Sequence, residues 1–129
     1  MTKPHIRVVA AEIERDGCFL IAQRRPEATM PLLWEFPGGR VESGETDEQA
    51  LARELMEVMG VRIQMGAQRL QVTHEYDGYS LDLVVYAATT DDEPQHLNVH
   101  DARWVRLEDF GDYEFPSADQ QTIEALLGL

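Results

Sequence analysis

The sequence predicts an α/β protein of the α+β type, in which a mixed β-sheet lies between helices in an α/β/α sandwich. Three observations predict this class. Apolar, partly β-branched runs bounded by turn residues occur in both halves of the chain, a capped amphipathic segment separates them, and a second helix-start signal follows the last run. A chain of 129 residues is long enough for one ordinary core and short for two. We therefore expect a single domain over residues 1–129, with two helices and about five strands.

The first two strands are expected to form a hairpin. Ile6–Ile13 and Cys18–Ala22 are apolar, and Arg15–Gly17 between them supplies a turn. Gln23–Leu33 contains two prolines and is expected to be a loop that leads into Trp34–Pro37 and a double glycine.

A capped helix is expected over about Asp47–Met59. Thr46 and Gln49 have the spacing of a capping box at its start, and Gly60 follows its last residue as a stop signal. Its apolar side consists of Ala50, Leu51, Leu55 and Met59. This side should pack on the sheet.

The second half of the chain returns to strand patterns. Arg69–Glu75 and Tyr79–Ala88 are expected to be strands joined by a turn at Tyr76–Tyr79, and Ala102–Val105 is expected to be a last short strand. Thr89–Val99 is polar and is expected to be a surface loop.

A second helix should begin at Pro116. Ser117 and Gln120 have the spacing of another capping box. The apolar side of this helix would consist of Ile123, Leu126 and Leu127. Such a helix would cover the second face of the sheet.

The charge balance limits the partners of the protein. Lys and Arg total 11 against 24 Asp and Glu, a formal net charge of −13, which would repel a nucleic-acid backbone. No apolar run approaches the length of a membrane span, and Arg7, Glu12 and Glu14 interrupt the stretch where a signal peptide would need its apolar core. We expect a cytoplasmic monomer or homodimer that binds neither nucleic acid nor membrane. Cys18 is expected to be a core residue rather than a nucleophile.

Two glutamates define a candidate metal site on the predicted helix. At ~100° per residue, Glu57 lies about 60° to one side of Glu54 and position 58 about 40° to the other, so the three positions share a face. Carboxylates placed in this way could hold Mg²⁺ or Mn²⁺, although such a pair is more often a solvated helix face. Arg24 and Arg25 likewise fit either phosphate binding or a solvated surface.

The wider pattern around these glutamates is more specific. Its positions, in one register, are Gly39, Glu45, Arg53, Glu54, Leu55, Glu57, Gly60 and Val61. This pattern resembles the Nudix box of Nudix hydrolases. The flanking segments Leu33–Gly39 and Phe115–Asp119 resemble the MutT and CTP pyrophosphohydrolase-like branch of that family.

The resemblance implies the Nudix fold along nearly the whole chain and an Mg²⁺-dependent enzyme, with Mn²⁺ as an alternative cofactor. The small-molecule substrate would be a nucleoside triphosphate, and the products would be a nucleoside monophosphate and pyrophosphate. Glu54 and Glu57 would be the metal ligands, and Glu54 is also a candidate base. Glu45 and Arg53 would complete the catalytic group by holding the loop to the helix.

The resemblance also implies the substrate-binding residues. Gly38 and Gly39 would permit the turn, Arg24 would contact phosphate, and Asp119 would read the base. An ionised Asp119 only accepts hydrogen bonds, which suits a cytosine amino group or a guanine N–H, so CTP and an oxidised guanine nucleotide both fit. A negative charge in the first turn of a helix is also favourable without any such role. Nucleotide sugars and dinucleoside polyphosphates are less favoured because the chain lacks an evident extra domain.

Two positions depart from the family pattern. The usual box has a further glutamate where this chain has Val58, and an apolar side chain cannot coordinate magnesium. MutT-like chains often place a glutamate six residues before the position of Trp104, where this chain has Asn98; nearby His100 and Asp101 could substitute for it. Two carboxylates can suffice for Mg²⁺. The alternative is a weakened or inactive nucleotide-binding module in which Val58 is a packing residue.

Overall fold

The structure is a computed structural model that describes residues 3–117 and residue 119. Within these residues it contains one complete α-helix, α1 (Asp47–Met59), and one 3-10 helix, η1 (Leu107–Asp112), and Ser117 and Asp119 at the end of the described chain are also helical. The strands in the described part of the chain are β1 (His5–Arg15), β2 (Cys18–Gln23), β3 (Trp34–Glu35), β4 (Gly38–Arg40), β5 (Gln64–Glu75), β6 (Ser80–Thr89) and β7 (Asp101–Arg106).

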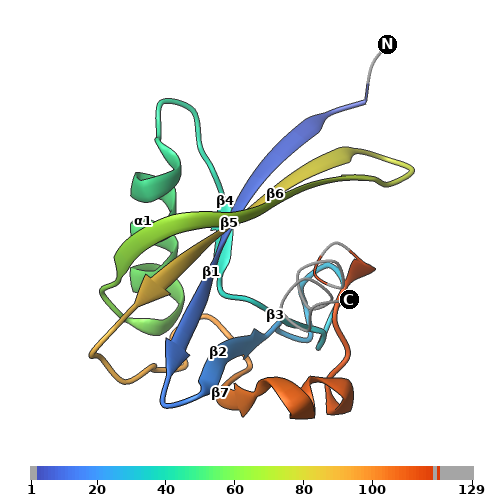
Figure 1. Cartoon of the computed structure of the whole chain (residues 1–129). Helices are drawn as coiled ribbons and strands as arrows, with labels where there is room; N and C mark the ends of the chain where they lie inside the picture. The colour runs from blue at the N-terminus through green and yellow to red at the C-terminus, as the bar shows by residue number, and fades with distance from the viewer. Residues whose placement is uncertain (1–2, 118, 120–129) are drawn as a thin grey trace.

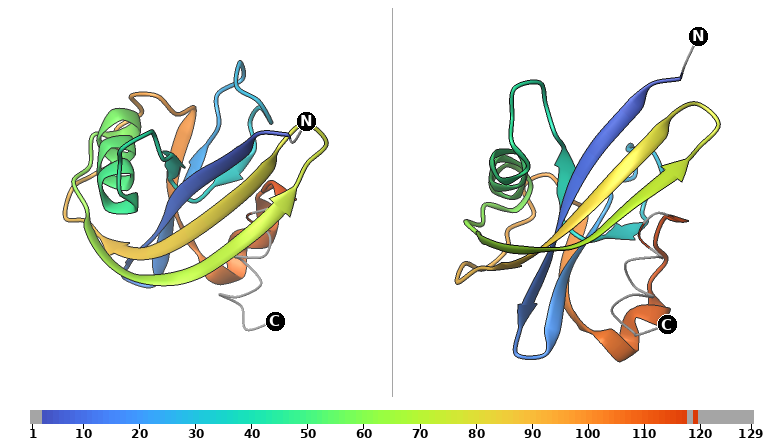
Figure 2. Two further views of the ribbon diagram at one scale, coloured as in Figure 1. Left: turned by 90° about the horizontal axis from the view of Figure 1, so that it is seen from above. Right: turned by 45° about the horizontal axis from the view of Figure 1, so that its top comes forward.

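The strands form one twisted sheet with β1 near its centre (Figure 1, Figure 2). The main order is β3-β2-β1-β6-β5, and in addition β4 pairs with β1 and β7 with β2. β1 and β6 are parallel over His5–Ile13 and Ser80–Ala88, whereas the other pairs are antiparallel. The α+β class and the mixed sheet predicted from the sequence are confirmed.

The expected hairpin connects β1 to β2 at one end of the sheet. Asp16 and Gly17 both have positive φ, 53° and 79°, between the paired residues Arg15 and Cys18. Positive φ at both central residues is the requirement of a type I′ turn, which Asp-Gly meets with little strain. The predicted hairpin is confirmed.

α1 begins and ends at the predicted caps. The Gln49 N–H donates to the Thr46 hydroxyl at 3.1 Å, and the Thr46 N–H donates to the Gln49 side-chain oxygen at 3.0 Å. Gly60 adopts the left-handed conformation at φ 67° and donates its N–H to the Met56 carbonyl. A side chain at this position would be strained, so the glycine allows the chain to turn from α1 towards β5.

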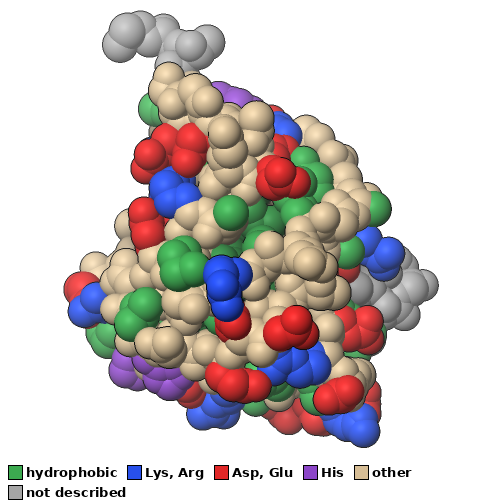
Figure 3. All heavy atoms as spheres, turned by 90° about the vertical axis from the view of Figure 1, so that its left-hand side faces the viewer, with side chains coloured by type: hydrophobic (Ala, Val, Ile, Leu, Met, Phe, Trp, Pro, Cys, Tyr) green, Lys and Arg blue, Asp and Glu red, His purple; other side chains and the backbone are tan. Residues whose placement is uncertain are grey.

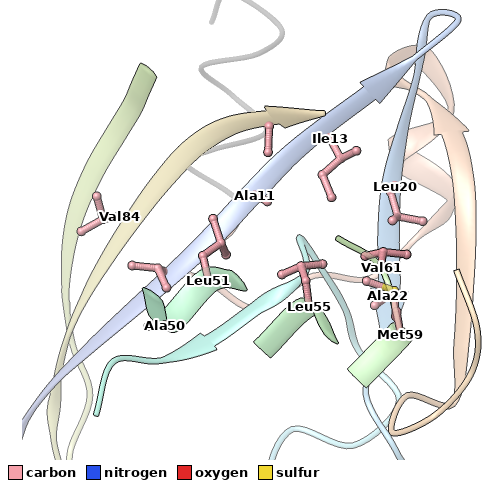
Figure 4. Packing of buried hydrophobic residues seen from close by; sticks show 12 residues of the cluster. Ala11, Ile13, Leu20, Ala22, Ala50, Leu51, Leu55, Met59, Val61 and Val84 are labelled. Carbon is pink, nitrogen blue, oxygen red and sulfur yellow. The ribbon is translucent and has the colours of Figure 1, made fainter. Parts of the chain in front are cut away.

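Alternating residues of the strands divide the core into two clusters on opposite faces of the sheet. On one face, Leu51 and Leu55 of α1 point towards Ile13 and Leu20 of the first hairpin (Figure 4). The predicted apolar side of α1 is buried in full. The cluster on the other face contains the aromatic residues Phe19, Trp34, Phe36, Phe110 and Phe115.

Three expectations need correction or lie beyond the described residues. β3 and β4 were not expected, because strands of two and three residues are too short to show a period. β5 begins at Gln64 rather than Arg69, because register shifts between Met65 and Leu70 break the alternation there. Of the second predicted helix only the start is described: Ser117 and Asp119 are helical, and the Asp119 N–H donates to the Pro116 carbonyl at 3.0 Å. Gln120 of the expected capping box and the apolar residues Ile123, Leu126 and Leu127 lie outside the described residues.

Surface charge is mixed in sign. Figure 3 shows one face of the molecule on which acidic and basic side chains are interspersed. Over the residues that the structure describes, no helix has both the length and the apolar character that crossing a membrane would require.

Candidate active site

The guanidinium of Arg53 joins the loop after β4 to the first two turns of α1. Its Nε and Nη2 donate to the two oxygens of Glu45 at 2.7 and 2.9 Å, and Nη2 also donates to the Arg40 carbonyl at 3.0 Å. Glu45 in turn accepts the Glu42 N–H at 2.9 Å. These bonds lower the pKa of Glu45 to about 2, first through Arg53 and then through the Glu42 N–H. Loop and helix are therefore held in one geometry by charge-assisted hydrogen bonds.

The same guanidinium brings the two candidate metal ligands together. Nη1 of Arg53 contacts Oε1 of Glu54 at 2.8 Å and Oε2 of Glu57 at 3.4 Å. Since both carboxylates contact one nitrogen atom, their oxygens lie close to each other. This pair of hard oxygen donors fits a divalent cation such as Mg²⁺, which typically uses one or two protein carboxylates together with substrate phosphates and water.

Gly39 allows the Glu54 carboxylate to approach the backbone of β4. A Cβ atom at Gly39 would lie 2.6 Å from Cγ of Glu54 and closer still to its carboxylate. Because that distance is well inside van der Waals contact, any side chain at Gly39 would displace Glu54. Gly38 is constrained in the same way, since its Cβ would lie 2.7 Å from Cα of Ala10.

A cleft of about 720 Å³ extends from α1 across β1 to the residues at the end of the described chain. Its lining includes five residues that the sequence singled out, which are Arg24, Gly38, Gly39, Glu54 and Asp119. Glu45, Arg53 and Glu57 adjoin it through the Arg53 network. A volume of this size suits a nucleotide-sized ligand.

The cleft also contains a cluster of partly buried charged groups that sequence reasoning missed in part. Nη1 of Arg24 lies 3.3 Å from both oxygens of Glu35, and its Nε and Nη2 donate to the Thr29 carbonyl and hydroxyl. Burial raises the pKa of Glu35, Arg24 opposes this, and the charge of Glu54 adds to it. Glu35 was overlooked, although a single acidic residue within the apolar run Leu33–Pro37 is a signal for a partly buried functional carboxyl group.

Asp119 lies in the same cluster and is only 7% exposed. Burial raises its pKa well above the usual range, and the charge of Glu35 raises it further, while Arg24 acts in the opposite direction. A protonated Asp119 donates one hydrogen bond as well as accepting others. The prediction from the sequence assumed an ionised Asp119, which only accepts hydrogen bonds. The protonated group can hydrogen-bond to acceptor atoms of a base as well as to donor groups.

Burial also raises the pKa of Glu54. The neighbouring charge of Glu57 acts in the same direction, whereas the bond from Arg53 opposes it. A carboxylate with a raised pKa is a better proton acceptor than an ordinary surface glutamate, which agrees with Glu54 as a candidate base.

Both departures from the family pattern lie in the cleft. Val58 and Asn98 line it, and the Asn98 N–H donates to the Val58 carbonyl at 3.0 Å. Asp101, considered as a substitute ligand, instead accepts the Ala102 N–H at 2.8 Å and contacts Nε of Arg103 at 2.9 Å. The His100 N–H donates to the Gln23 carbonyl, which holds the loop before β7 against β2.

The glycine turn, the Arg53 network and the carboxylate pair on α1 are the parts of a Nudix box in three dimensions, and a family profile for the NUDIX domain matches residues 8–125. The chain belongs to the Nudix hydrolase family, whose members generally use a divalent metal ion. Within that family it is of the MutT and CTP pyrophosphohydrolase type.

Named relatives share most of their length with this chain. The CTP pyrophosphohydrolase of Escherichia coli K12 is 37% identical over 127 residues, covering 96% of this chain and 93% of the relative. The 8-oxo-dGTP diphosphatase of the same organism is 31% identical over 127 residues, covering 98% of each chain.

Solved structures agree with this assignment. The E. coli ORF135 protein in solution superposes with a TM-score of 0.81 at 35% identity, over 98% of this chain and 91% of that one. The MutT protein of Methanosarcina mazei Go1 superposes with a TM-score of 0.87 at 25% identity, over 97% of this chain and 94% of that one.

Proposed function

We propose that this protein is an Mg²⁺-dependent nucleoside triphosphate pyrophosphohydrolase that releases a nucleoside monophosphate and pyrophosphate. The observation that carries the proposal is the pairing of Glu54 and Glu57 on one guanidinium beside a nucleotide-sized cleft. The named relatives, a CTP pyrophosphohydrolase and an 8-oxo-dGTP diphosphatase, support a nucleotide substrate.

In this proposal Glu54 and Glu57 hold the metal ion, and Glu45 and Arg53 keep their helix and loop aligned. When bound, a divalent cation acidifies a water molecule and offsets charge on phosphate oxygens. Glu54 accepts a proton from the attacking water. The oxygen of that water forms a new bond to one phosphorus of the anhydride between the α- and β-phosphates as the bond from that phosphorus to the bridging oxygen breaks. The bridging oxygen stays with the departing fragment, and the products are a nucleoside monophosphate and pyrophosphate.

The base would occupy the end of the cleft near Asp119 and Arg24. A protonated Asp119 can both donate to and accept from a base edge, so CTP and an oxidised guanine nucleotide both fit this end of the cleft. Phe36 and Leu83 also line the cleft and make part of its wall apolar.

The rival function is a nucleotide-binding module with little hydrolysis. One observation favours it, because Val58 packs against the core cluster beneath α1 while it lines the cleft. In that case Val58, at the position of the missing glutamate, would have only a packing role.

A product assay separates the two functions. Purified protein is incubated with Mg²⁺ and a panel that contains CTP, 8-oxo-dGTP and the common nucleoside triphosphates, and the products are identified by phosphorus NMR. We expect monophosphate and pyrophosphate from at least one member. Measurable nucleotide binding without product release above a Glu54→Gln control would establish the binding module instead.

A further inference from the structure

Arg25 contacts one of the two positions at which this chain lacks a family carboxylate and is linked through it to the other. Its Nη1 donates to the side-chain oxygen of Asn98 at 2.8 Å, and Asn98 is bonded through its backbone to Val58. All three residues line the cleft that also contains Glu54. The loop after β2, the C-terminal end of α1 and the loop before β7 therefore meet at one point.

Resting on the proposed function, we infer that Arg25 neutralises the negative charge of a substrate phosphate on the Val58 side of the cleft. In a chain with a further glutamate at position 58, a metal ion held by that glutamate would supply this positive charge. A glutamate at position 98 would pair with this guanidinium and cancel its charge, and a glutamate at position 58 would add a negative charge to the same cleft. Valine and asparagine leave that charge available for an anion. The absence of glutamates at positions 58 and 98 and the presence of Arg25 are thus parts of one phosphate-binding arrangement.

The contacts of Arg25 leave it able to serve a ligand. Besides Asn98 it contacts Glu27, through Nε at 2.5 Å, in a pair whose side chains are 50% and 62% exposed. Exposed ion pairs of this kind contribute little to stability, so a phosphate group can replace Glu27 at low cost. The Nη2 group adds two further donors, and the planar guanidinium matches the geometry of phosphate oxygens.

Arg24, in contrast, is engaged by other groups of the protein. Its three nitrogen atoms contact Thr29 and the half-buried Glu35. Moving it towards the phosphates would leave the half-buried Glu35 carboxylate without this partner. The two adjacent arginines are therefore assigned different tasks, since Arg24 holds Glu35 and Arg25 serves the phosphate.

The first test measures binding without metal, so that it does not depend on hydrolysis. The affinity for a triphosphate analogue with a methylene bridge between the α- and β-phosphates is measured calorimetrically in EDTA. Arg25→Ala should weaken binding about tenfold, the loss of one charge-assisted contact of about 1.4 kcal/mol. Arg25→Lys should recover part of this loss. Arg106→Ala, which removes an exposed arginine of β7, should bind like the wild type.

The second test asks whether Arg25 takes the place of a metal ion held by a carboxylate at position 58. Arg25→Ala is repeated in a Val58→Glu background with Mg²⁺ present, and the cost of removing the arginine should be several-fold smaller there than in the wild type. An equal cost in both backgrounds, or metal-free binding that is absent or unaffected by Arg25→Ala, would overturn the inference. A separate measurement tests the proposed function: absence of pyrophosphate release by the wild type would contradict the proposed function.

Discussion

At the scale of single residues, Val58 decides which side chains are available to the proposed metal site. Its position shares a helix face with Glu54 and Glu57, and its side chain is only partly buried at the cleft. We predict that Val58→Glu raises the affinity for Mn²⁺ by about tenfold or more, because groups that support a metal site are each worth roughly 10–100-fold. Electron paramagnetic resonance of free Mn²⁺ measures this directly. Val58→Gln, which adds length without charge, is the matched control.

An unchanged or lower Mn²⁺ affinity in Val58→Glu would mean that position 58 does not face the metal. Comparing the thermal stability of the two variants separates this result from a packing defect, since glutamate and glutamine have similar volumes.

Asp119 provides a second prediction at the residue scale, on pH dependence. Its pKa in the folded protein is raised, so the protonated form is favoured and the wild type loses stability as the pH rises from about 4 through the folded pKa. An asparagine side chain at this position does not ionise. The melting temperature of Asp119→Asn should therefore rise relative to the wild type between pH 4 and pH 8. Asp109→Asn, at an exposed position in η1, is the control for replacing an aspartate by an asparagine. A difference for Asp119→Asn that does not vary with pH would contradict the raised pKa.

At the scale of elements, the loop after β4 and α1 act as one unit through Glu45 and Arg53. The pKa of Glu45 is lowered from about 4.5 to about 2, so its contribution to stability is present above pH 4.5 and is lost as the pH falls towards 2. Glu45→Gln should lower the melting temperature at neutral pH, and this difference should shrink below pH 4.5. Differential scanning fluorimetry across pH measures both effects.

Glu48→Gln is the control for this element, since it neutralises an exposed carboxylate in the first turn of the same helix. If the two variants respond alike at every pH, the loop is not held to α1 by the Glu45 carboxylate. The same Glu45→Gln change should reduce turnover, because it frees Arg53 to pair more closely with Glu54 and Glu57.

Elements with local signals were predictable from the sequence. The hairpin follows from Asp16-Gly17, and α1 follows from Thr46, Gln49 and Gly60, because turns and caps depend on neighbours in the chain. β3 and β4 depend on pairing with distant strands, so no local pattern indicates them.

At the scale of the whole molecule, the sheet brings together residues that are distant in the sequence. Contacts of this kind could not be predicted from the sequence alone. Pairing of β2 with β3 sets Glu35 opposite Ala22, which brings Glu35 to Arg24 across the loop. Arg25 meets Asn98 only because the backbone joins the loop before β7 to α1. The family motif therefore indicated the proposed metal-binding face from the sequence, whereas the charged groups around that face could be identified only from the fold.

The central claim is that two carboxylates on α1 are enough for metal-dependent hydrolysis. The most direct test is the rate of pyrophosphate release from the preferred nucleotide as Mg²⁺ is titrated, for the wild type, Glu54→Gln and Glu57→Gln. We predict saturable, Mg²⁺-dependent release by the wild type and a loss of at least about a hundredfold for Glu54→Gln, which removes a metal ligand and the candidate base. Glu57→Gln should require more Mg²⁺ for half-maximal release. Equal rates for the wild type and Glu54→Gln at saturating Mg²⁺ would contradict the account.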